Sequence, residues 1–108
     1  MDTASAFAEA WYNLADLLDD QGRSGDAVEC LRKALVVAPD YIDAMFNLAL
    51  LLQRQGVYGE AAEYWRRYLV SDRASEWAAR ARRSLKFCEI QANSLASASG
   101  SADSDKAA

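Results

Sequence analysis

The 108-residue sequence has no histidine, only two cysteines and a single proline. Cys30 and Cys88 stand far apart and form no CxxC pair, which excludes zinc sites of the usual cysteine and histidine spacing. The first eight residues lack a basic region followed by an apolar stretch, so we expect no secretory signal. Two reduced, partly buried thiols in a cytoplasmic protein are therefore favoured over a disulfide, which the two cysteines would still allow.

Other absences narrow the functional classes. The sequence has no run of 18 apolar residues, so neither a membrane span nor a membrane partner is expected. Its glycines recur at turn positions and form no phosphate-binding loop. Because histidine is absent and the carboxylates are expected on helix faces open to water, we predict that the chain is not an enzyme and needs no cofactor or metal. The net charge of -4 argues against a nucleic-acid partner.

What the sequence does contain is a stretch that occurs twice. Residues 8–41 and 42–75 align without a gap, and 14 of the 34 aligned positions are identical. Asn13 and Asn47 are one such pair, and Gly22 and Gly56 are another. A fixed period of this length indicates stacked units that cannot bury their apolar faces alone. The sequence therefore predicts a repeat protein that presents a binding surface.

Apolar residues recur at helical spacing in both copies, so each copy is predicted to form two helices. The stripe of the first helix consists of Trp11, Leu14, Ala15 and Leu18. Within the copies the predicted helices span residues 8–21, 26–37, 42–54 and 58–70. The predicted organisation is a lead-in at residues 1–7, a first repeat at 8–41, a second repeat at 42–75, a capping helix at 76–91 and a disordered tail at 92–108. The tail is assigned from its low-complexity alanine, serine, glycine and aspartate composition.

The placement of large and small residues in the two copies resembles the tetratricopeptide repeat. The matching positions of the first copy are Trp11, Leu14, Ala15, Leu18, Ala27, Leu31 and Pro39. Those of the second copy are Met45, Leu48, Ala49, Leu52, Ala61 and Trp65, with Arg73 where the family has proline. The resemblance implies an all-α fold of five helices, a right-handed α-α superhelix of helical hairpins, with a concave groove that binds peptide segments.

The same resemblance implies which residues line the groove. They are Glu9, Tyr12, Asn13, Asp16, Asp19, Asp20, Asp43, Phe46, Asn47, Leu50, Gln53 and Arg54. Tyr12 and Phe46 occupy equivalent positions, where they could sandwich an apolar side chain. Asn13 and Asn47 could each bond a peptide backbone, or could satisfy neighbouring helix ends instead. Only Asn47 matches the Lys/Asn/Arg carboxylate clamp of some family members, so binding of a C-terminal carboxylate is not expected.

Charge is distributed unevenly along the chain. Residues 1–30 hold seven acidic residues and one basic residue, whereas residues 61–90 hold seven basic and four acidic ones. Asp16, Asp19 and Asp20 can be read as a patch for a basic peptide, as a metal site or as a solvated helix face. The basic end can be read as solvated helix faces or as a head-to-tail contact with the acidic end of another copy.

The sequence thus predicts a protein–protein interaction scaffold or adaptor that binds a peptide segment or partner helix in its concave groove. Two alternatives stay open: a self-associating structural module that forms a homo-oligomer, or one domain of a larger regulatory protein or enzyme. Two copies with a cap fall short of the three repeats that such arrays usually need for stability.

Overall fold

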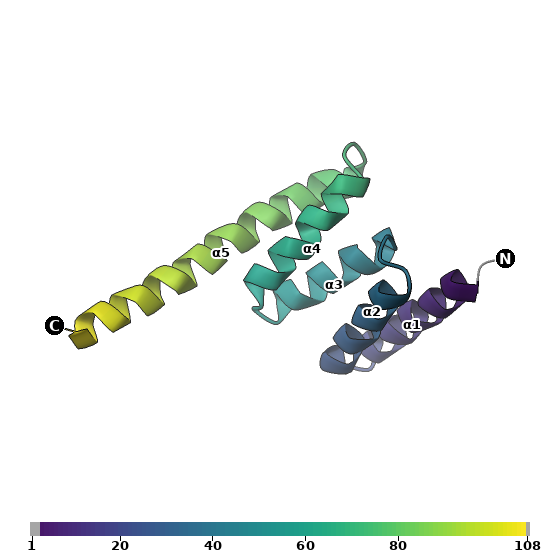
Figure 1. Ribbon diagram of the computed structural model, residues 1–108, viewed down its shortest axis with the longest axis horizontal. Helices are drawn as coiled ribbons and strands as arrows, with labels where there is room; N and C mark the ends of the chain where they lie inside the picture. Colours follow the sequence, from purple (N-terminus) through teal and green to yellow (C-terminus); the bar gives the residue numbers. More distant parts are fainter. Residues whose placement is uncertain (1–2, 108) are drawn as a thin grey trace.

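The computed structural model describes residues 3–107, with side chains described up to residue 97, and this part of the chain holds five α-helices and no strand. The helices are α1 (Thr3–Asp20), α2 (Ser24–Val37), α3 (Ile42–Arg54), α4 (Tyr58–Ser71) and α5 (Glu76–Ala107). The predicted all-α class and the helical hairpin solenoid are confirmed. Figure 1 shows an elongated array with α1 at one end and α5 at the other, and the extents are 62 × 31 × 22 Å.

Each helix packs mainly on the helices next to it in the sequence, α1 on α2, α2 on α3, α3 on α4 and α4 on α5. The linkers between helices are three or four residues long, which reverses the chain at every step. An ion pair between Arg32 of α2 and Glu60 of α4, with an N–O distance of 2.6 Å, also joins the two hairpins. The array is therefore built from neighbours, as expected for stacked repeats.

The two turns inside the hairpins have the same geometry. Gly22 and Gly56 adopt positive φ angles of 77° and 79°, a conformation that favours glycine. The following residues, Arg23 and Val57, donate backbone hydrogen bonds of 2.8 and 2.9 Å to carbonyls five residues earlier. This is the Schellman arrangement that ends a helix at glycine. The predicted helix stop at Gly22 and its repeat at Gly56 are confirmed.

The core lies where large side chains meet small ones. Trp65, Leu31 and Leu48 are fully buried, and alanines such as Ala27 and Ala61 sit at the helix crossings with no exposed surface. Leu14, expected in the buried stripe of the first helix, is instead exposed. The reason is that α1 ends the array and has a packing partner on one side only.

Two helix ends differ from the predicted ones. α1 already begins at Thr3, so most of the predicted lead-in at residues 1–7 is helical. α5 continues through Ala107, past the predicted end at residue 91, so the expected disordered tail at 92–108 is a helix in the part that the structure describes. The stretch is rich in alanine and contains no proline, and its one glycine, Gly100, lies inside α5 without ending it. Its side chains at residues 93–97 are all exposed.

Across the described residues, none of the helices has the length and apolar character needed to cross a membrane.

Candidate functional site

One side of the array carries a cavity of about 400 Å³ between α1, α3, α4 and α5. We call it the aromatic pocket, and its lining residues are Tyr12, Asp43, Phe46, Asn47, Leu50, Tyr68, Trp77 and Arg80. Five of these eight residues come from the predicted groove set. The aromatic pocket thus joins the inner helices of both repeats to the start of the capping helix.

Phe46 forms the centre of the pocket's aromatic cluster. Its ring meets Trp65, Tyr68 and Trp77 edge to face, with centroid distances of 4.8, 5.2 and 5.5 Å. Such arrangements are favourable for aromatic quadrupoles and fix the rings relative to one another. Phe46 is buried, whereas Trp77 is 57% exposed. Trp77 is therefore the aromatic wall that a partner can reach.

Arg80 stands one helical turn after Trp77 on α5. Its guanidinium carbon lies 5.8 Å from the Phe46 ring centroid and 6.0 Å from that of Trp77, which is cation–π range. Within the described residues, Arg80 forms no ion pair with a carboxylate. The aromatic pocket is thus bordered by a cation that can receive an acidic group.

Tyr12 already has partners inside the protein. The side-chain nitrogen of Asn47 donates a hydrogen bond of 2.8 Å to its hydroxyl oxygen, and its ring packs against Tyr41 at a centroid distance of 5.3 Å. Burial raises the pKa of Tyr12, and the nearby carboxylates of Asp43 and Asp16 act in the same direction. Tyr12 and Phe46 border one cavity, but each ring also packs against other aromatic rings of the chain.

A second, smaller cavity of about 70 Å³ adjoins the aromatic pocket, because Asn47 and Leu50 line both. The lining residues of this acidic cleft are Ala15, Asp16, Asp19, Leu31, Asn47, Leu50, Leu51 and Arg54. Arg54 pairs with Asp19 at an N–O distance of 3.4 Å, and Ser24 donates to the same carboxylate. Asp16 forms no such pair within the described residues. The aromatic pocket and the acidic cleft together form one continuous groove.

The structure brings most of the predicted site residues to this groove. They are Tyr12, Asp16, Asp19, Asp43, Phe46, Asn47, Leu50 and Arg54. Glu9 lines a separate hollow of about 300 Å³ beside Tyr41. Asn13 and Asp20 are exposed on α1 and line none of the three cavities described here.

The groove residues that were not predicted are Tyr68, Trp77 and Arg80 of the aromatic pocket and Ala15, Leu31 and Leu51 of the acidic cleft. Helical spacing puts Trp77 on one apolar face of the capping helix with Ala81 and Cys88, and Arg80 on a basic face with Arg83, but it does not reveal the angle at which α5 meets α3. Gln53, in contrast, was predicted to line the groove but lines neither of its two cavities. Its side-chain oxygen accepts hydrogen bonds from Trp65 and Cys88, so it faces the neighbouring helices rather than the groove.

Among the residues that the structure describes, no three histidine, cysteine, aspartate or glutamate side chains are grouped to hold a metal ion. The cluster of Asp16, Asp19 and Asp20 is divided by the ion pair between Asp19 and Arg54. The groove therefore offers hydrogen-bonding, charged and aromatic groups to a partner.

Comparison with known proteins bears on what such a groove is. The sequence model of the tetratricopeptide repeat matches this chain over residues 4–40 and again over residues 12–84. The chain belongs to the tetratricopeptide repeat family. No curated protein sequence matches it. Members of this family generally act as non-catalytic modules that mediate interactions between proteins.

Solved structures share the fold of this chain. One is the crystal structure of MamA protein, which superposes with a TM-score of 0.73 at 21% sequence identity. The match covers 84% of this chain and 48% of that one, so this chain spans about half the length of MamA protein. At this level of identity, the likeness establishes the repeat fold alone.

Proposed function

We propose that the chain binds a segment of a partner protein in the groove formed by the aromatic pocket and the acidic cleft. The observation that carries the proposal is the exposed Trp77 beside a cavity of about 400 Å³. A half-exposed tryptophan next to a ready-made hollow is a typical anchor for binding, because an inserted apolar side chain buries its ring without unfolding anything.

The charges along the groove suggest how the segment is oriented. Arg80, on α5, borders the aromatic pocket, whereas Asp16, near the C-terminal end of α1, lies in the acidic cleft. A segment with an apolar residue at its centre would place an acidic group at Arg80 and a basic group at Asp16. Complementary charges of this kind fix register more than they raise affinity.

The two cysteines bear on the compartment. Cys30 and Cys88 are both free and buried, on α2 and α5. Burial raises the pKa of each thiol, which keeps them in the unreactive protonated form. Unpaired thiols are consistent with a reducing compartment, and a cytoplasmic location stays a prediction.

The groove can be tested with peptides selected from a random 12-residue phage-display library against the whole chain. Trp77→Ala removes the exposed anchor and Arg80→Glu reverses the border charge. We expect each to weaken binding of the selected peptides by about tenfold or more, as for aromatic and arginine anchors elsewhere. Fluorescence anisotropy with labelled peptides measures the effect.

The matched control is Val36→Ala, which shortens an exposed apolar side chain on α2 outside the groove. Circular dichroism confirms that all three variants stay folded. Selected peptides that bind Trp77→Ala and Arg80→Glu as tightly as they bind the unaltered chain would rule out the groove as the site.

A further inference from the structure

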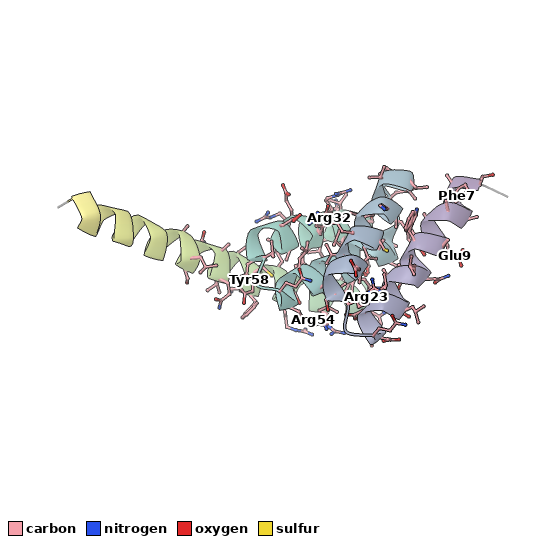
Figure 2. The ribbon with its side chains drawn as sticks, turned by 90° about the horizontal axis from the view of Figure 1, so that it is seen from below. Phe7, Glu9, Arg23, Arg32, Arg54 and Tyr58 are labelled. Carbon is pink, nitrogen blue, oxygen red and sulfur yellow. The ribbon has the colours of Figure 1, made fainter. Side chains whose placement is uncertain are left out.

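The outward side of α1 carries an apolar stripe. Phe7, Leu14 and Leu17 follow one another at i, i+7 and i+10, so they share one helix face, and Phe7 and Leu17 are 59% and 54% exposed. Alanine at position 10 lies between them on the same face and is also exposed. Figure 2 shows Phe7 at the α1 end of the molecule. None of these side chains lines the groove.

The outward side of α5, at the other end of the array, carries a second stripe. Arg83, Phe87 and Ile90 follow at i, i+4 and i+7, and Phe87 and Ile90 are 44% and 54% exposed. The face of α5 that packs on α4 is a different one, marked by the buried Ala78, Ala81 and Cys88. The ring of Phe87 also meets the Tyr58 ring of α4, at a centroid distance of 5.7 Å, so this stripe is partly covered within the chain. The array thus ends on both sides in a helix that leaves apolar side chains exposed.

The charges next to the two stripes are opposite in sign and opposite in order. On α1 the acidic residue Asp20 lies at the end of the helix, after the apolar stripe, whereas Asp16 faces the acidic cleft. On α5 the basic residue Arg83 comes before the apolar residues, with Lys86 beside them. Within the described residues, Asp20, Arg83 and Lys86 take part in no ion pair. Laid antiparallel, the helices would match apolar with apolar and acid with base.

We infer that α1 of one copy docks antiparallel on α5 of a second copy, so that the protein assembles head to tail. The short linkers make successive helices of the array run in opposite directions, and this contact continues that alternation across the boundary between copies. A contact between two different surfaces leaves one of each free on every dimer. Assembly therefore grows into longer chains or closes into a ring, and the peptide groove stays open in each copy.

The test measures mass by light scattering and sedimentation velocity over a range of concentrations of the full chain. At low salt, about 50 mM, we expect the mean mass to rise with concentration, and at about 500 mM salt to fall back, because exposed charge pairs are screened. Leu17→Glu and Ile90→Glu should each abolish the rise. Val36→Glu, which places the same charge on an exposed site of α2, should leave it intact.

Charge reversal tests the antiparallel register. Asp20→Arg and Arg83→Asp each set like charges against each other, and each should weaken self-association by about tenfold. The double variant D20R/R83D recreates the pair with its signs exchanged, so it should recover association. Both positions are exposed, and circular dichroism checks that the fold is kept.

A monomer at every concentration and salt would overturn the proposal, as would a double variant that associates no better than the two single ones. Peptide binding reports separately on the groove: Leu17→Glu and Ile90→Glu should bind the selected peptides as the unaltered chain does. Failure of self-association and failure of the groove are thereby told apart.

Discussion

At the scale of single residues, Gln53 links three helices. Its side-chain oxygen accepts a hydrogen bond of 3.0 Å from the Trp65 indole nitrogen and one of 3.3 Å from the Cys88 thiol. Trp65 and Cys88 have no exposed surface, so each relies on this oxygen for a partner to its polar hydrogen. One amide on α3 therefore satisfies α4 and α5 at once. Its position in the repeat predicted that Gln53 lines the groove. The repeat pattern does not say which side-chain amide instead faces the neighbouring helices.

Replacing Gln53 with alanine should lower the free energy of unfolding by about 1–3 kcal/mol, since a buried indole N–H is left without an acceptor. Urea unfolding followed by circular dichroism measures the change. Gln55→Ala removes an exposed amide two residues later and should stay within about 0.5 kcal/mol of the unaltered chain. Equal losses in the two variants would contradict the linking role of Gln53.

Asp72 organises the linker between α4 and α5. Its carboxylate accepts hydrogen bonds from the Tyr68 hydroxyl at 2.6 Å, from the Ser75 amide at 3.2 Å and from the Ser75 hydroxyl. The Ser75 oxygen in turn accepts from the Ala78 amide at 3.1 Å, as an N-cap of α5 does. The first repeat has Pro39 at the corresponding stretch, whereas this linker, with Arg73, is held by side-chain bonds instead.

These bonds make stability depend on pH. Donation by the Ser75 and Tyr68 hydroxyls lowers the pKa of Asp72 to about 2, below its usual 3.8. A lowered pKa stabilises the fold above the unfolded-state value, and this contribution disappears as the pH falls towards 2. We expect Asp72→Asn to flatten the loss of stability between about pH 4 and pH 2, in urea titrations at fixed pH.

Asp72 is not the only carboxylate that makes stability depend on pH, because Arg32 also lowers the pKa of Glu60. The test therefore needs a control variant at an exposed carboxylate. Glu63→Gln removes an exposed carboxylate of α4 and should leave the slope unchanged. If Asp72→Asn kept the full acid slope of the unaltered chain, the linker network would not be its source.

At the scale of elements, the turn signals explain why α3 is predicted with both ends correct. Gly56 closes it through a positive φ angle that other residues avoid. α2 starts two residues before the predicted helix, a difference typical of helix starts without a side-chain cap. α5 has no such stop signal, and its alanine-rich composition suits both a disordered tail and a helix. Sequence therefore places both ends of α2, α3 and α4 to within two residues, whereas the start of α1 and the end of α5 are missed.

The far part of α5 should contribute little to stability. Residues 93–97 are exposed, so no packing offsets the entropy of ordering them. Removing residues 93–108 should change the free energy of unfolding by less than about 0.5 kcal/mol in urea unfolding. Removing residues 86–108 also deletes the buried Cys88 and should unfold the chain or cost several kcal/mol. Similar losses from both truncations would show that the far part of α5 does pack.

At the scale of the whole molecule, the repeat pattern predicts the array and most of the groove. The resemblance to the tetratricopeptide repeat, carried over by position, placed Tyr12, Phe46 and Asn47 in the groove, and they meet in one pocket. The pocket is completed by Trp77 and Arg80, whose place depends on how α5 lies against α3 and α4. That orientation follows from packing between helices far apart in the sequence, which a single sequence read by periodicity does not contain.

The packing of each helix on its sequence neighbours also has a kinetic consequence. Contacts formed mainly between helices adjacent in the sequence join residues that are close along the chain, so little loop entropy must be lost before each is made. Low contact order is associated with folding in microseconds to milliseconds. Nucleation can begin in either hairpin and spread to the other. During synthesis the first hairpin could therefore form before the second has been made, because its contacts need no residues from later in the chain.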